Sequence, residues 1–106
     1  MITIKNFKNL SNGFNYVYED EVENGETVLL KMPAVAPNKR GINDIGFMTD
    51  DNLTIYATLS ATPNINDEKE WQEIYPYDEI NKTTSYLKIV NNFDDAGRVI
   101  IRVIMN

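Results

Sequence analysis

Carboxylates are the side chains of this sequence with the most obvious chemistry. Five of them fall within residues 19–26 with no basic residue among them, and the 106-residue chain has a net charge of -6. Such a run could coordinate a divalent cation or meet a basic partner. A solvated hairpin tip explains the run without any ligand, and we favour that interpretation, so the sequence predicts no metal ligand.

The chain contains neither His nor Cys. This excludes nucleophiles of the Ser-His and Cys-His kinds, zinc sites built from Cys and His, disulfides, and haem ligation by either residue. A pair of acids can still hydrolyse a glycoside, but one small domain leaves little material to wall a deep cleft. We therefore expect no enzyme, no catalytic residue and no cofactor.

Three aromatic residues, Trp71, Tyr75 and Tyr77, offer the clearest ligand chemistry. Flat aromatic faces match the apolar faces of sugar rings, so the three could form a platform that binds carbohydrate. The alternative is that Trp71 fills the sandwich core and the two tyrosines lie at its rim. We favour the alternative, and the platform stays open as a second hypothesis.

The last strand expected from the sequence, residues 98–105, carries apolar residues on both faces. One parity is apolar throughout, and on the other Ile100 and Ile104 alternate with arginines such as Arg102. A strand solvated on one side has polar residues there, so Ile100 and Ile104 need a cover. Either a neighbouring subunit or loops and arginine stems of the same chain could supply it. Ile100, Arg102 and Ile104 are therefore candidate interface residues.

The N-terminus provides two more candidate interface residues, Ile2 and Ile4, which alternate with polar side chains. This pattern indicates a short edge strand or an arm within residues 1–12. An edge strand has free backbone donors and acceptors, so it pairs readily with another chain.

The composition favours strands over helices, because Ile, Val and Thr together outnumber Ala and Leu by more than two to one. The clearest two-residue alternation places Leu53, Ile55 and Leu59 on one face of residues 53–59. About eight such short segments are separated by turn residues at intervals of roughly 8–12 residues. The sequence predicts a single all-β domain over residues 1–106, an antiparallel β-sandwich of the jelly-roll or Ig-like kind.

Three tight connections are expected to join neighbouring strands as hairpins. Asn24-Gly25 can supply the positive φ angles of a turn between residues 14–18 and residues 27–32. The turn residues of 49–52 and of 92–97 are expected to act in the same way.

Two classes of partner are disfavoured. The excess of acids repels a phosphate backbone, so we expect no nucleic-acid partner. No stretch approaches the roughly 20 apolar residues of a membrane span, and the first residues lack the apolar region of a signal peptide, so we expect no membrane contact.

The second half of the chain has a regular succession of expected strands and breaks: LTIYATLS at residues 53–60, Pro63, Trp71 with Ile74, YLKIVN at residues 86–91 and VIIRV at residues 99–103. This succession resembles small all-β accessory proteins of tailed bacteriophages, which decorate capsids or belong to tail and fibre assemblies. The resemblance covers residues 24–106 and transfers no functional residue. It implies a non-enzymatic structural protein of the virion, made in the host cytoplasm, that binds a protein lattice or self-associates.

Three functions are therefore considered. The leading one is a virion structural or decoration protein that docks on other virion proteins or on itself, as a homo-oligomer, through its N-terminal or C-terminal strand. The second is a carbohydrate- or cell-surface-binding module that uses Trp71, Tyr75 and Tyr77. The third is an inhibitor that presents the acids of residues 19–26 to a basic host protein.

Overall fold

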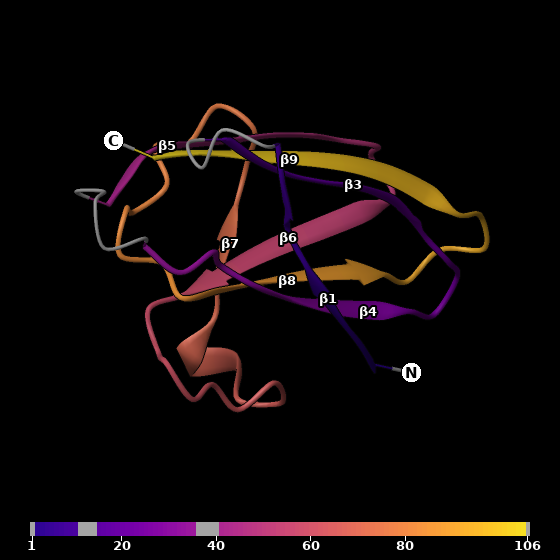
Figure 1. The fold of residues 1–106 in the computed structure, drawn as a ribbon. Coiled ribbons are helices and arrows are strands. Elements are labelled where there is room, and N and C mark those ends of the chain that lie inside the picture. The colour runs from indigo at the N-terminus through magenta and orange to yellow at the C-terminus, as the bar shows by residue number, and fades with distance from the viewer. Residues whose placement is uncertain (1, 11–14, 36–40, 106) are drawn as a thin grey trace.

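The computed structural model describes residues 2–10, 15–35 and 41–105, which form two β-sheets packed face to face (Figure 1). Residues 11–14, which include part of two predicted elements, lie outside the described part. Five strands form sheet A in the order β1-β4-β8-β6-β7, and four form sheet B in the order β2-β3-β9-β5. The predicted all-β sandwich is confirmed.

The strands are short, as the sequence predicts. Those of sheet A are β1 (Ile2–Asn6), β4 (Thr27–Lys31), β8 (Tyr86–Asn91), β6 (Leu53–Thr58) and β7 (Gln72–Ile74). Those of sheet B are β2 (Lys8–Asn9), β3 (Asn15–Val22), β9 (Gly97–Met105) and β5 (Ile42–Thr49). All strand pairs are antiparallel except β1 with β4, which run parallel.

The core lies between the sheets and is built from the inward positions of the strands. The most completely buried side chains of the central strands are Val28, Leu30, Leu87, Ile89, Val99, Ile101 and Val103. Leu53 and Ile55 also point inward, as predicted. Leu59 was expected to continue that face, but it is 58% exposed because β6 ends at Thr58 and the alternation ends with it.

The three predicted hairpins are wrong, and all three fail in the same way. β3 and β4, β5 and β6, and β8 and β9 are consecutive in the chain, yet the members of each pair lie in different sheets. Each turn is therefore an arch that carries the chain from one sheet to the other, and all three arches lie at one end of the sandwich (Figure 1). Gly25 still takes the positive φ expected of it, 74°, because a tight arch needs the same reversal as a hairpin. We call residues 23–26, 50–52 and 91–96, which include the last residue of β8, the arch end.

The N-terminal strand switches between the two sheets instead of extending as an arm. Residues 2–6 pair with β4 in sheet A, and Lys8 and Asn9 pair with β3 in sheet B. Between them Phe7 is half-buried and packs against the core. In Figure 1 this segment crosses the front of the sandwich and closes that side. Of the two alternatives predicted within residues 1–12, a short edge strand or an arm, the described residues 2–10 form the edge strand.

A long connection, residues 59–71, leaves β6 and returns as β7, and it contains the short 3-10 helix η1 (Glu68–Glu70). The Asp67 side chain accepts a hydrogen bond from the amide of Lys69 and so caps the helix. In Figure 1 the connection lies on the side of sheet A that faces away from sheet B.

Candidate interaction surfaces

The first candidate surface is the β1 edge, which we define as Ile2–Asn6. β1 stands at the end of sheet A, so no strand lies beyond it among the described residues. Ile2 and Ile4 are 52% and 69% exposed. Ile4 lies opposite Leu29 of β4, which is half-buried on the same outer face of sheet A. The structure thus places both predicted N-terminal interface residues on a strand that has one side of its backbone available for pairing.

A carboxylate is held beside the β1 edge. One oxygen of Glu26, Oε2, accepts a hydrogen bond from the hydroxyl of Thr3 at 2.8 Å. The other, Oε1, accepts from the backbone amide of Glu23 at 3.0 Å. Both contacts fix the position of the Glu26 side chain, which leaves a negative charge at the margin of a strand whose only charged residue is Lys5.

The second candidate surface is the outer face of sheet B, which we call the B face. Its central strand presents Ile100, Arg102 and Ile104, and Ile104 is 39% exposed. Ile100 is half-buried and lies opposite Met48 of β5, which is 73% exposed. The second face of residues 98–105 is therefore only partly covered by its own chain.

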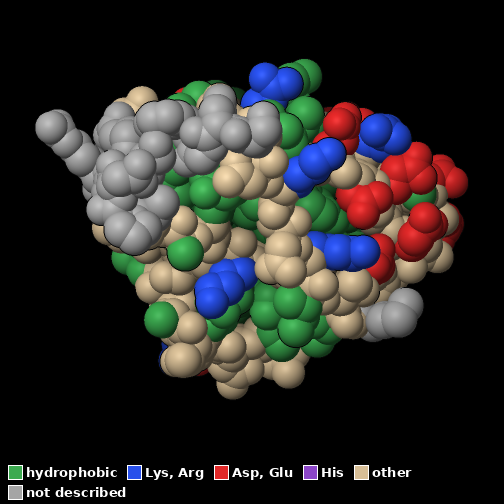
Figure 2. Space-filling model, in the orientation of Figure 1, with side chains coloured by type: hydrophobic (Ala, Val, Ile, Leu, Met, Phe, Trp, Pro, Cys, Tyr) green, Lys and Arg blue, Asp and Glu red, His purple; other side chains and the backbone are tan. Residues whose placement is uncertain are grey.

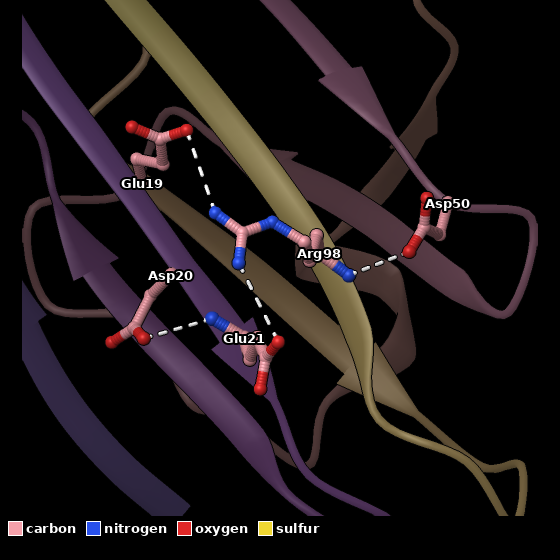
Figure 3. A network of polar contacts seen from close by, with 5 residues as sticks. All are labelled: Glu19, Asp20, Glu21, Asp50 and Arg98. Atoms are coloured by element: carbon pink, nitrogen blue, oxygen red, sulfur yellow. Dashed lines mark hydrogen bonds and ion pairs between the residues drawn. The ribbon is translucent and has the colours of Figure 1, made fainter.

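Arginine ion pairs occupy the end of the B face that adjoins the arch end (Figure 3). The guanidinium of Arg98 lies 3.6 Å from Glu19 and 3.4 Å from Glu21, and its backbone amide donates to Asp50 at 2.8 Å. Side chains of both ion pairs are more than half exposed, so each pair contributes about 0–1 kcal/mol to stability. The run of acids at residues 19–26 is thus partly neutralised.

The acid run does not form the hairpin tip that we expected. Glu19, Asp20 and Glu21 lie within strand β3, and β3 leads into an arch. Among the described residues no group of three or more acids is placed to hold a metal ion. Figure 2 shows acidic side chains gathered toward the arch end, with lysine and arginine side chains over the middle of the side along which β1 runs.

At the arch end, the buried side chain of Asn91 forms hydrogen bonds that link the end of β3 to the third arch. Asn91 has no exposed surface, and its Nδ2 donates to the carbonyls of Val22 and Asp95 at 2.8 Å each. Its Oδ1 accepts from the amide of Phe93 at 2.9 Å. Asn91 was not predicted as a structural residue, because an asparagine at the end of an apolar strand is indistinguishable from a turn residue until its neighbours in space are known.

Trp71 is buried, but it does not fill the sandwich core, so the favoured placement is wrong. It is absent from the cluster of side chains packed between the sheets. Its indole N–H donates to the carbonyl of Asn64 at 3.0 Å, within the connection that covers sheet A from outside. The ammonium of Lys88 lies 4.7 Å from the indole ring and 4.8 Å from the ring of Tyr56, and burial lowers the pKa of Lys88.

Tyr75 and Tyr77 are separate from the tryptophan. They are 46% and 86% exposed, and their rings stack at 5.9 Å with 10° between the planes. Among the described residues no hydrogen bond or ring stacking joins them to Trp71, which is only 7% exposed. The three predicted platform residues therefore do not present one continuous aromatic surface. A hollow of about 630 Å³ is lined by Trp71 together with apolar side chains and with polar ones such as Glu70, Asp78 and Asn81, and neither tyrosine is part of that lining.

Comparison with known proteins adds no identification. No family model matches the chain, and no curated protein or solved structure does so either. Within the described residues, no helix is long and apolar enough to cross a membrane.

Proposed function

We propose that this protein is a non-enzymatic structural component of a phage particle that works by associating with its own copies and with other virion proteins. The observation that carries the proposal is the β1 edge, where two exposed isoleucines lie on a strand that has no neighbour on one side among the described residues. The phage assignment is supported only by the resemblance of residues 24–106 to small accessory proteins of virions.

The proposal fits the character of the surfaces. Exposed apolar side chains on monomeric proteins are usually scattered, whereas on the β1 edge Ile2 and Ile4 fall at successive outward positions of one strand, and the B face carries Ile104, the exposed Met48 and the half-buried Ile100. Such positions are suited to strand addition or to packing against another sheet. The inhibitor hypothesis has weaker support, because Glu19 and Glu21 of its acid run already pair with Arg98.

A cosedimentation assay tests this function. The purified chain would be mixed with capsids and, separately, with tails of a tailed phage, and its self-association would be followed by light scattering at micromolar concentration. We expect the wild-type chain to form oligomers and to sediment with one of the particles. A chain that remains monomeric and binds neither particle contradicts the proposal.

Carbohydrate binding is a second candidate because Trp71 lines a hollow together with carboxylate and amide groups that can accept hydrogen bonds from sugar hydroxyls. A glycan array would compare the wild-type chain with Glu79→Gln, which changes an exposed residue of the lining without touching the buried tryptophan. Binding that is lost in the variant would favour the second function, and an array with no bound glycan would remove it.

A further inference from the structure

From the β1 edge we infer that two copies of this chain join through antiparallel pairing of β1 with β1 about a two-fold axis at Ile4, which makes one continuous ten-stranded sheet from two copies of sheet A. This inference rests on the proposed function and specifies its self-association. A second copy is the natural occupant, because the edge offers a strand ladder and an identical strand completes it.

The side chains on the outer face select the register. When Ile4 faces Ile4 of the second copy, the apolar row Leu29–Ile4 continues directly into its symmetry mate across the new interface. Ile2 then faces Asn6 at each end of the strand. Cross-strand apolar pairs of this kind stabilise a sheet, and here the two isoleucines, each 69% exposed in one chain, cover one another.

Charge on the inner face supports the same register. Residues 2–10 carry two lysines and no acid, so two such segments would repel each other without a compensating group. With Ile4 at the axis, Lys5 of one copy faces Thr3 of the other, and Thr3 is hydrogen-bonded to Glu26. Each Lys5 ammonium is therefore brought toward the Glu26 carboxylate of the second copy, twice by symmetry. A shift of the axis by one residue to Lys5 would instead place the two lysines opposite each other.

Disulfide trapping tests the register. The chain has no cysteine, so a single introduced thiol can form a disulfide only with another chain. Directly opposed residues of antiparallel strands have Cα atoms roughly 4.5–5.5 Å apart, which suits a disulfide. We expect Ile4→Cys to give a covalent dimer under mild oxidation, whereas Met48→Cys, an exposed control on the B face, stays monomeric.

A mixed pair of variants confirms the antiparallel direction. Ile2→Cys and Asn6→Cys should each give little disulfide alone and should give the heterodimer when mixed, because each residue faces the other across the interface. Disulfide formation in Met48→Cys but not in Ile4→Cys overturns the inference in favour of the B face.

A charge exchange tests the inner face without oxidation. We expect Lys5→Glu to raise the dissociation constant of the dimer by at least about tenfold, because it places a carboxylate against Glu26. The double variant Lys5→Glu with Glu26→Lys should recover association, and Lys69→Glu, at the opposite side of sheet A, should leave it unchanged. Circular dichroism would establish that each variant is folded.

The outcomes separate the two proposals. A wild-type chain that self-associates while Ile4→Cys does not crosslink, or while Lys5→Glu has no effect, overturns the β1 pairing and leaves the proposed function to another surface. A chain that stays monomeric at all concentrations and also ignores phage particles overturns both.

Discussion

The arch end and the β1 edge are both exposed, but they differ in how their backbone polar groups are satisfied. At the arch end Asn91 binds two carbonyls and one amide, and Asn52 donates to the carbonyl of Asp95, so the three arches hold one another. At the β1 edge one side of the strand has no neighbouring strand among the described residues. The arch end thus satisfies its backbone polar groups within the chain, whereas the β1 edge can accept a partner strand.

The largest loss of stability is expected from the removal of the Asn91 side chain at the arch end. Asn91→Ala leaves the carbonyl of Val22 without this partner in a buried place, and it leaves the carbonyl of Asp95 and the amide of Phe93 without it in a partly buried place. We expect a loss of about 3 kcal/mol in the free energy of unfolding, measured by urea denaturation. The neighbouring Asn92→Ala changes an exposed residue and should cost less than about 0.5 kcal/mol. Equal losses in the two variants would contradict the role given to Asn91.

The next largest loss of stability is expected from Gly97→Ala, with Gly46→Ala as its control. A Cβ on Gly97, where the third arch enters β9, would lie 2.7 Å from Cγ of the buried Leu53, whereas a Cβ on Gly46 of the B face meets nothing within 4 Å. Gly97→Ala should therefore destabilise the protein by about 1–3 kcal/mol. Gly46→Ala should be neutral or stabilising by less than about 1 kcal/mol. Thermal unfolding of both variants measures the difference, and a Gly97→Ala protein as stable as wild type would show that the arch has room that the structure does not give it.

The faces of the strands could be predicted from the sequence, but the pairing of the strands could not. Alternation in residues 53–59 and 98–105 predicted correctly that Leu53, Ile55 and Ile101 face the core, because a strand's face depends on its own residues. It did not predict which strand pairs with which. Asn24-Gly25 reverses the chain equally well in a hairpin and in an arch, and the choice depends on contacts between distant segments such as Asn91 with Val22.

The candidate sites, like the fold, could be predicted only where local sequence patterns determine them. Ile2 and Ile4 were recognised from local alternation, and the structure places them on an edge strand. The location of Trp71 was not predicted, because its burial requires the connection of residues 59–71 to fold back over the outer face of sheet A. Glu26 was counted only as one of a run of acids, since its contact with Thr3 joins residues 23 positions apart.

A smaller loss of stability is expected when residues 59–71, the connection over the outer face of sheet A, lose a contact. Lys88→Met keeps the side-chain stem and removes the ammonium that lies over Trp71 and Tyr56 and donates to the carbonyl of Ile65. We expect a loss of about 1 kcal/mol and a red shift of the fluorescence of the single tryptophan, because residues 59–71 lose an anchor. Lys69→Met, an exposed residue of η1, should change neither quantity. An unchanged emission spectrum in Lys88→Met would show that the cation does not hold the connection.

The smallest change in the free energy of unfolding at neutral pH is expected from a substitution of Tyr18. Burial first, and then the charges of Asp20 and Glu26, raise the pKa of Tyr18 to about 12. The unfolded phenol ionises near 10, so the unfolded state loses its proton first and the wild-type protein loses stability as the pH rises from about 10 to 12. Tyr18→Phe removes this dependence and also removes a buried hydroxyl with no hydrogen-bond partner among the described residues. Unfolding curves at pH 7 and pH 11 should show a smaller alkaline loss for the variant, and an identical loss would contradict the assignment.

Concentration-dependent hydrogen exchange compares the two regions in one experiment. If β1 pairs with β1 of a second copy, backbone amides of residues 2–6 that point away from β4 exchange slowly in concentrated protein and faster on dilution. The amides of the arch end, such as those of Asn91 and Phe93, exchange at the same rate at both concentrations. Exchange of residues 2–6 that is independent of concentration, while another surface becomes protected or none does, would contradict the account.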